Sequence, residues 1–232
     1  MAGLKERYEQ VLTDFTAVCS RCGKKPGEDV KLVAVSKFFP AEDLRRVYDL
    51  GQRDFGENRA QEMFAKAPVL PADIRWHFIG RLQRNKVKYI IDKACMIHSV
   101  DSLALAGEIS RQALLKQVEI PVLLEVNLGG EESKAGMAYG EVQENMRAIS
   151  LLPGIKIQGL MTIGPYEEDP ENSRPLFRRM KELLEEAKSW QIPGAEMKYL
   201  SMGMSHDFVA AIEEGANIVR VGSSIFGHRN YN

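Results

Sequence analysis

Apolar positions along the chain alternate between two periods. Residues 4–23 place apolar side chains at helical spacing, whereas residues 31–37, KLVAVSK, form a short apolar run typical of a buried strand. The alternation continues to residue 222. It predicts helices at 40–51, 58–67, 84–92, 102–116, 138–151, 173–190 and 205–215, and strands at 31–37, 53–55, 74–80, 95–100, 120–128, 155–163, 197–203 and 217–222.

The predicted strands are arranged as in an α/β protein with a parallel sheet. Several of them are apolar throughout, which is expected when both faces of a sheet are buried. Eight βα units favour closure into a single (β/α)8 TIM-like barrel with an extra N-terminal helix, and a doubly wound open sheet is the alternative. We find no linker or repeat, so we expect residues 1–232 to form one domain.

Composition narrows the classes of partner. The chain has 232 residues, 31 basic and 32 acidic, so its net charge of -1 gives no indication of a nucleic-acid partner. No apolar run approaches the roughly 20 residues of a membrane span, and the first residues lack an apolar signal core. We therefore expect a cytoplasmic protein. Cys19 and Cys22 have a spacing found in redox and zinc sites, but no second ligand pair follows, so we expect free thiols.

Polar residues and glycines gather where the predicted strands end. Lys37 ends the first strand, Asn58 follows the second and Asn127 ends the fifth, while the segments 200–205 and 220–227 follow the last two. In a (β/α)8 barrel the carboxyl ends of the strands form the active face. These residues are therefore expected to share one rim.

Two of these segments suggest an anion site. LSMGMS (200–205) and RVGSSIFG (220–227) are rich in glycine and serine, whose small side chains let backbone N–H groups approach an oxygen-rich ligand. Loops after the seventh and eighth strands commonly bind phosphate in barrel enzymes. Ser205 is also predicted to begin a helix. Ordinary turns remain the alternative explanation.

Lys37 has two possible explanations. A lysine at the end of an apolar strand either extends its amine into solvent or sits in a partly desolvated pocket. In a pocket, its amine loses a proton more readily and can form a Schiff base with an aldehyde. A lysine facing a phosphate site would suit pyridoxal 5'-phosphate (PLP), and equally a sugar-phosphate aldolase.

Long motifs then connect the chain to a known family. They resemble, in order, those of the PLP homeostasis proteins, a family of PLP-binding barrels similar to the N-terminal barrel of alanine racemase. The resemblance covers residues 31–229. It is carried by VAVSKFFP (33–40), FGENRAQE (55–62), WHFIGRLQRNK (76–86), IHSVDS (97–102), EVNLGGEESKAG (125–136), GLMTIGP (159–165) and LSMGMSHDFVAAIEEGANIVRVGSSIFG (200–227).

The resemblance implies a role for individual residues. Lys37 would hold PLP as an internal aldimine, Asn58 would lie beside the ring, and Arg220 would face the pyridine nitrogen. A permanent cation at that nitrogen disfavours its protonation and weakens the ring as an electron sink. The phosphate would be held by Ser201, Met202, Gly222 and Ser223.

The resemblance also implies a function. It indicates a protein of intracellular vitamin B6 homeostasis that buffers PLP or delivers it to PLP-dependent enzymes, as a monomer and without established catalytic turnover. Two enzymatic alternatives remain. A small amino-acid racemase would need a second base opposite Lys37, and none of the seven tyrosines can be placed there. A Schiff-base aldolase would need a carboxylate close to the lysine, for which Glu57 is the candidate.

A few side chains depart from the family pattern or lack a clear role. Arg59 stands where an aromatic residue is frequent, and Arg81 and Arg84 stand where other side chains are common. These cations would either bind a second anion or be solvated, and the latter is the usual state of exposed charges. His77 lies in a strand between Trp76 and Phe78, where a hydrogen-bonded structural histidine is favoured over a proton shuttle.

Overall fold

Parallel strands close into a barrel. The computed structural model describes residues 3–128 and 135–227. Within them, eight strands pair in the order β4-β3-β2-β1-β9-β8-β7-β5, and a pairing of β4 with β5 closes the ring. The strands are β1 (Lys31–Val35), β2 (Asp54–Glu57), β3 (Arg75–Phe78), β4 (Ala94–Val100), β5 (Ile120–Asn127), β7 (Ile155–Met161), β8 (Ala195–Met204) and β9 (Ile218–Val221).

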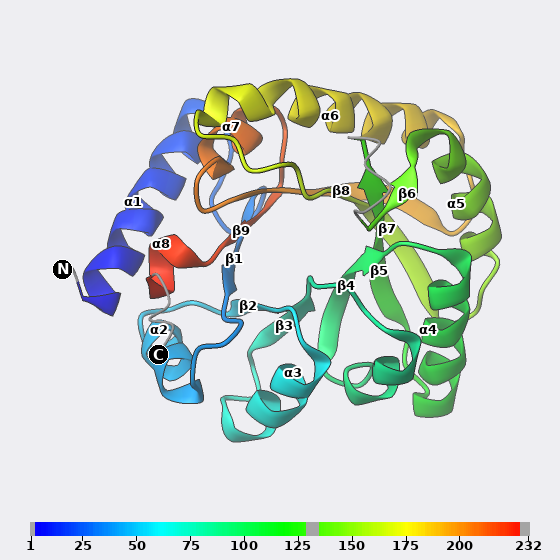
Figure 1. Cartoon of the computed structure of the whole chain (residues 1–232), viewed down its shortest axis with the longest axis horizontal. Coiled ribbons are helices and arrows are strands. Elements are labelled where there is room, and N and C mark those ends of the chain that lie inside the picture. Colours follow the sequence, from blue (N-terminus) through cyan, green and yellow to red (C-terminus); the bar gives the residue numbers. More distant parts are fainter. Residues whose placement is uncertain (1–2, 129–134, 228–232) are drawn as a thin grey trace.

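Helices surround the strands as an outer ring (Figure 1). No helix among residues 3–128 and 135–227 is long and apolar enough to cross a membrane. The α-helices are α1 (Leu4–Arg21), α2 (Ala41–Asp49), α3 (Ala60–Lys66), α4 (Leu103–Lys116), α5 (Val142–Ser150), α6 (Arg174–Ser189), α7 (Phe208–Glu213) and α8 (Ser223–Phe226). Short 3-10 turns occupy η1 (Ala67–Val69), η2 (Arg84–Tyr89), η3 (Tyr139–Glu141) and η4 (Pro170–Ser173).

The predicted barrel and its N-terminal helix are confirmed, with three local corrections. The sequence pattern missed the two-residue strand β6 (Met137–Ala138) beside β5, and it missed α8. The helix predicted to begin at Ser205 was also placed wrongly. A turn occupies residues 205–207 and α7 begins at Phe208, because the Asp207 carboxylate accepts the backbone N–H of Met204 at 2.6 Å and holds the chain in that turn.

The apolar core has two parts. A large cluster fills the space between the strands and the helices, and a small cluster fills the inside of the barrel. The inner cluster consists of Val33, Met96, Leu123, Met161 and Ile218, from five different strands. This arrangement matches the layered interior of a packed (β/α)8 barrel, so the barrel is not a pore.

Charged residues lie next to this inner apolar layer. Side chains two residues apart in a strand face the same side, so Glu125 follows Leu123 toward the barrel interior. Glu125 is only 5% exposed. Burial and the nearby Asp101 raise its pKa to about 7, although the positive charges of Arg220 and Arg81 oppose the shift. The interior is therefore polar toward the carboxyl ends of the strands.

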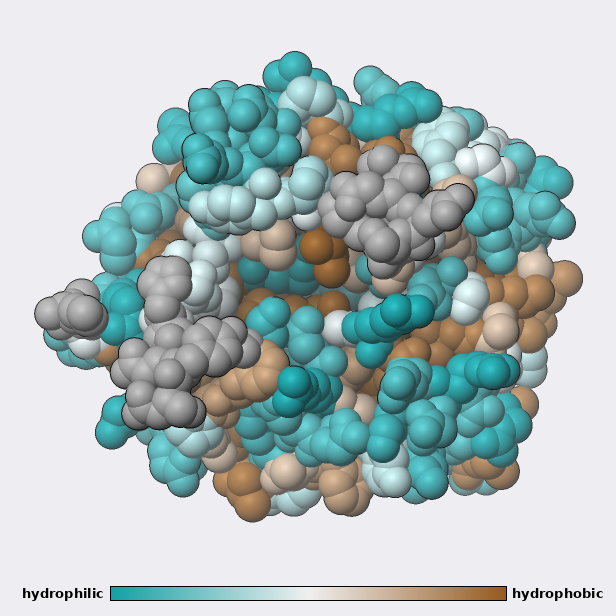
Figure 2. Space-filling model, viewed as in Figure 1, coloured by the Kyte–Doolittle hydropathy of each residue, from teal (hydrophilic) through white to brown (hydrophobic). Residues whose placement is uncertain are grey.

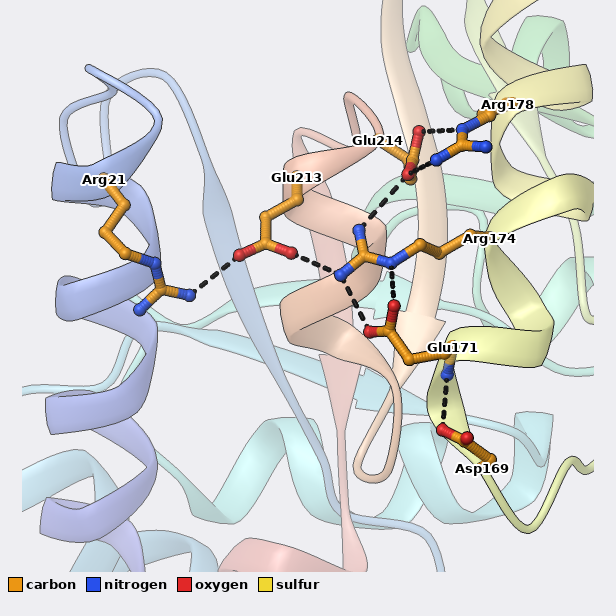
Figure 3. Close-up of polar contacts among 7 residues, drawn as sticks. All are labelled: Arg21, Asp169, Glu171, Arg174, Arg178, Glu213 and Glu214. Atoms are coloured by element: carbon orange, nitrogen blue, oxygen red, sulfur yellow. Dashed lines mark hydrogen bonds and ion pairs between the residues drawn. The ribbon is translucent and has the colours of Figure 1, made fainter.

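A surface ion-pair network joins three helices and η4 (Figure 3). Arg174 at the start of α6 contacts Glu171 of η4 at 2.7 Å and Glu213 at the end of α7 at 2.6 Å. Glu213 also pairs with Arg21 of α1 at 2.8 Å, so charge alternates from α1 through α7 to α6. Networks of this kind stabilise more than isolated exposed pairs do.

We predict that Arg174→Ala lowers the free energy of unfolding by about 1 kcal/mol at low salt, because it removes the centre of this network. The loss should shrink in 1 M NaCl, where screening acts over about 3 Å. Urea denaturation at both salt concentrations measures it. Lys188→Ala is the matched control, since among the described residues Lys188 pairs only with its helix neighbour Glu185. An equal loss in both variants would contradict the network.

A second prediction concerns Glu125. Because the folded state raises its pKa from 4.5 to about 7, the folded protein binds this proton more tightly than the unfolded chain does. The free energy of unfolding should therefore fall as pH rises from about 4.5 to about 7. Glu125→Gln should remove this part of the pH dependence while other groups titrate unchanged. Parallel slopes for both proteins in urea titrations from pH 5 to pH 8 would refute it.

Candidate functional site

A cavity opens at the carboxyl ends of the barrel strands. Its volume is about 390 Å³, within the range of roughly 300–1,000 Å³ typical of small-molecule sites. It brings together five of the sequence-predicted residues, which are Lys37, Asn58, Arg220, Gly222 and Ser223. In the view of Figure 1, the space-filling surface is hollowed near its centre, bordered by hydrophilic and hydrophobic residues (Figure 2).

A buried ion pair fixes the backbone next to Lys37. Glu57, at the end of β2, is fully buried and contacts Lys66 Nζ at 2.7 Å through Oε1. The same oxygen accepts the Ser36 hydroxyl at 2.8 Å, and Lys66 Nζ donates to the Ser36 carbonyl at 3.0 Å. Burial raises the pKa of Glu57 even though Lys66 and Ser36 favour its charged form. Ser36, directly before Lys37, is thus held on both its side chain and its carbonyl.

The residue after Lys37 is held as well. The backbone N–H of Phe38 donates to Glu62 Oε2 at 2.6 Å, and this oxygen also contacts Lys66 at 2.9 Å. Phe38 has a φ of 69°, a left-handed conformation that is uncommon for a bulky residue. The carboxylate of Glu62 favours this turn, which ends β1 and leaves the half-buried Lys37 at the cavity.

A chain of hydrogen bonds crosses the barrel behind the cavity. Asp54 Oδ1 lies 2.9 Å from His77 Nε2, and His77 Nδ1 lies 2.9 Å from His98 Nε2. His98 Nδ1 lies 3.0 Å from the Ser201 Oγ, to which Arg220 Nη1 donates at 2.6 Å. The chain therefore runs from β2 through β3, β4 and β8 to Arg220 on β9.

The protonation of this chain follows from its environment. Burial alone would lower the pKa of His77, but Cys95 and Asp54 raise it to about 9. Burial and the charges of His77 and Arg220 lower the pKa of His98 well below its ordinary value. His77 is therefore a cation that donates from both ring nitrogens, and His98 is neutral, accepting at Nε2 and donating from Nδ1.

Arg220 is the cation at the cavity end of this chain. Its side chain is 4% exposed, and its Nη2 donates to the Thr162 carbonyl at 2.8 Å. Burial lowers its pKa to about 10, against the raising effect of Glu125 and Asp207, so the guanidinium stays charged at neutral pH. Two bonds, to Ser201 and to Thr162, fix its orientation.

The two serine-rich segments meet through Ser205. Its Oγ accepts the backbone N–H of Gly222 at 3.0 Å and that of Ser224 at 3.4 Å. Arg7 of α1 donates to the carbonyls of Ile225 and Phe226, both at 3.0 Å, and so holds α8 from its other end. Ser205 and Ser223 both line the cavity. Hydroxyls and a glycine thus face the same space as Lys37.

Ser201 and Met202 do not line this cavity, although the sequence grouped them with the phosphate-binding residues. Strand β8 continues to Met204, so Ser201 and Met202 both lie within the strand, and both are fully buried. Ser201 faces inward to Arg220, and Met202 packs in the outer apolar cluster. The lining residues from this segment are Met204 and Ser205.

The structure also places other residues that the sequence analysis discussed or missed. The geometry of His77 agrees with the favoured structural role, since both ring nitrogens are bonded inside the barrel. Cys19 and Cys22 are free thiols, as expected. Residues 129–134 of the 125–136 motif lie outside the described residues. Sequence reasoning missed His98 and Lys66, because a lone histidine or a helical lysine carries no spacing signal.

Comparison with known proteins identifies the family. The family model for the alanine racemase N-terminal domain matches residues 16–230. A pyridoxal phosphate homeostasis protein of Aquifex aeolicus is 46% identical over 228 residues, which cover 97% of this chain and 98% of the relative. The protein of the same name from Escherichia coli strain K12 is 34% identical and covers 100% and 99%.

Solved structures lead to the same group. PipY of Synechococcus elongatus, determined with PLP bound, is 36% identical with a TM-score of 0.80, covering 92% of this chain and all of PipY. Alanine racemase from Corynebacterium glutamicum is 18% identical with a TM-score of 0.70, covering 96% of this chain and 62% of the racemase, and shows a shared fold alone. The chain belongs to the pyridoxal phosphate homeostasis protein family, whose barrel is that of the alanine racemase N-terminal domain.

Proposed function

We propose that this protein binds PLP in the cavity at Lys37 and serves in PLP homeostasis by buffering or delivering the cofactor. The observation that carries the proposal is the meeting of Lys37, Arg220 and the serine-rich loops around one small cavity. The names of its relatives and the PLP bound to PipY support it. Its recipients, its location in the cytoplasm and its monomeric state remain predictions.

The donor set of the cavity fits this cofactor. Asn58 lines the cavity, and its buried Oδ1 has no hydrogen-bond partner, which leaves one acceptor beside the ligand space unsatisfied. Ser205 and Ser223 offer hydroxyl donors of the kind that a phosphate accepts, and Gly222 leaves their surroundings open. When bound, PLP supplies an aldehyde for amines and an electron-withdrawing pyridine ring.

Each residue would then have a distinct task. Lys37 would hold the aldehyde carbon through its Nζ as an imine, with the loss of one water. Gly222, Ser223 and Ser205 would hold the phosphate. Ser201 would act on the ligand indirectly, through the guanidinium of Arg220 that it orients.

The charge of Arg220 favours a role for the site in binding the cofactor over a role in catalytic turnover. The guanidinium of Arg220 is held in place by the Ser201 hydroxyl and the Thr162 carbonyl, and it stays charged at neutral pH although burial lowers its pKa to about 10. A fixed cation beside a pyridine nitrogen disfavours protonation of that nitrogen and so weakens the ring as an electron sink. We propose that the site holds the cofactor for exchange and has no catalytic turnover of its own.

The enzymatic alternatives find less support. A racemase needs a second base opposite Lys37, and the described residues that line the cavity include no tyrosine or histidine. An aldolase needs a carboxylate beside the lysine. Glu57 does not line the cavity, and its Oε1 is occupied by Lys66 and Ser36.

We predict that borohydride treatment of the PLP-loaded protein attaches one pyridoxyl group to Lys37, which peptide mass spectrometry can map. Lys37→Ala should lose this adduct and the visible absorption of the imine, because no other amine is expected at the cavity. It should retain weaker, noncovalent binding through the phosphate site. Lys31→Ala, at the opposite end of the same strand, is the matched control and should behave as the unchanged protein.

Either of two results would overturn this assignment. The adduct could map to a lysine other than Lys37, or Lys37→Ala could retain the native absorption spectrum. A protein that takes up no PLP at all would exclude the proposed function and return attention to the aldolase.

A further inference from the structure

A second, larger cavity lies beside the first. Its volume is about 820 Å³, and Asn58 lines both cavities. Four cations, Arg59, Arg81, Arg84 and Lys86, line it together with one carboxylate, Asp101. The whole chain carries a net charge of -1, so this cavity concentrates positive charge that the composition conceals.

Nearby carboxylates do not neutralise these cations. Within the described ranges, Arg81, Arg84 and Lys86 form no ion pair. Glu108 lies close enough to Arg84 for its pKa to respond, but it is held by two bonds from Arg111, at 2.8 and 2.9 Å. Arg84 therefore faces the cavity with its charge available to a ligand.

The remaining acids are also engaged. Arg59 approaches Glu62 Oε1 only to 4.0 Å, while Glu62 Oε2 is taken by Lys66 and the backbone of Phe38. Asp101 accepts the Ser102 hydroxyl at 3.0 Å but keeps its negative charge, so the cavity lining has four cations against this one carboxylate. Guanidinium and ammonium groups that converge on one concave space are the donors that bind phosphate best.

The second cavity also lies at the start of a helix. The start of α4 lines it, with Ser102 as the N-cap and Ala104 and Leu105 in the first turn, so the positive end of a 14-residue helix faces the same space. The cavity is large enough for a phosphorylated ring. Through Asn58 it adjoins the space that contains Lys37.

We propose that this cavity is a second, noncovalent binding site for a phosphomonoester of about the size of PLP. Arg81 and Arg84 hold the phosphate, and Arg59 and Lys86 add to the local positive charge. The site places one phosphorylated molecule next to another that occupies the Lys37 cavity. This proposal rests on the proposed function, because the second site would hold a vitamer that enters or leaves the Lys37 cavity.

A protein whose first site is covalently filled tests this proposal. The PLP-loaded chain is reduced with borohydride, and intact mass spectrometry counts the pyridoxyl groups. Calorimetry then titrates this protein with pyridoxine 5'-phosphate, which carries the ring and the phosphate but no aldehyde. One further equivalent should bind, with an affinity that falls as salt rises. Arg81→Ala/Arg84→Ala should weaken binding at least about tenfold.

Controls separate a site from general charge attraction. Arg45→Ala/Arg46→Ala removes the same charge from α2 and should leave the affinity unchanged. Lys86→Ala should give a smaller loss and serves if the double variant does not fold. Glycerol 3-phosphate and inorganic phosphate are titrated in parallel. Equal binding of all three would show recognition of the phosphate group alone and would contradict a site for an ester of about the size of PLP. Preference for the pyridoxine ester would assign the site to vitamers.

The outcomes that overturn the proposal are distinct from a failure of the proposed function. No binding to the reduced protein, or equal weakening by the α2 variant, would refute the second site. If no pyridoxyl group is attached to Lys37, the proposed function fails instead. The same titration of the unmodified chain, with and without Arg81 and Arg84, then still decides whether the second cavity binds phosphomonoesters.

Discussion

The ion pair between Glu57 and Lys66 is the contact on which the candidate site depends. Both side chains are withdrawn from water, so each charge would be costly without the other, and removing one partner of such a pair typically costs about 3–5 kcal/mol. The same two residues and Glu62 also bind Ser36 and the N–H of Phe38. The orientation of Lys37 is thus tied to a contact that the fold itself needs.

Two layers inside the barrel, one apolar and one polar, have different physical roles. An apolar layer around Leu123 supplies packing, and a polar layer around Glu125 and Arg220 supplies orientation. The hydrogen-bonded chain from Asp54 to Arg220 makes the polar layer possible, because each buried polar atom along it has a partner. A ligand at the cavity would meet a cation whose position is already fixed.

Charged side chains on the surface of the barrel are arranged in two different ways. The network around Arg174 joins helices on the outside of the barrel, and there every cation faces a carboxylate. Around Arg81 and Arg84 the cations instead face a cavity. A nearly equal number of basic and acidic residues, 31 and 32, therefore conceals two arrangements, of which one stabilises the fold and the other attracts an anion.

The sequence by itself determined the barrel, its N-terminal helix and the family. The period of the hydrophobic residues is a local property, so KLVAVSK and the seven strands predicted after it can be recognised in order without knowledge of distant contacts. The motifs also placed Lys37, Asn58, Arg220, Gly222 and Ser223 at one rim, since the ends of parallel strands must meet there.

Only the tertiary structure decided which side chains face the cavity. Strand β8 runs past Ser201 because its pairing with β9 continues to Met204, whereas its pairing with β7 ends at Ser201. Ser201 is thereby turned toward Arg220, and the cavity is left to Ser205. The links from Glu57 to Lys66 and from His98 to Ser201 join residues distant in sequence or on different elements. No local pattern encodes them, because their energy comes from burial that exists only once the barrel has closed.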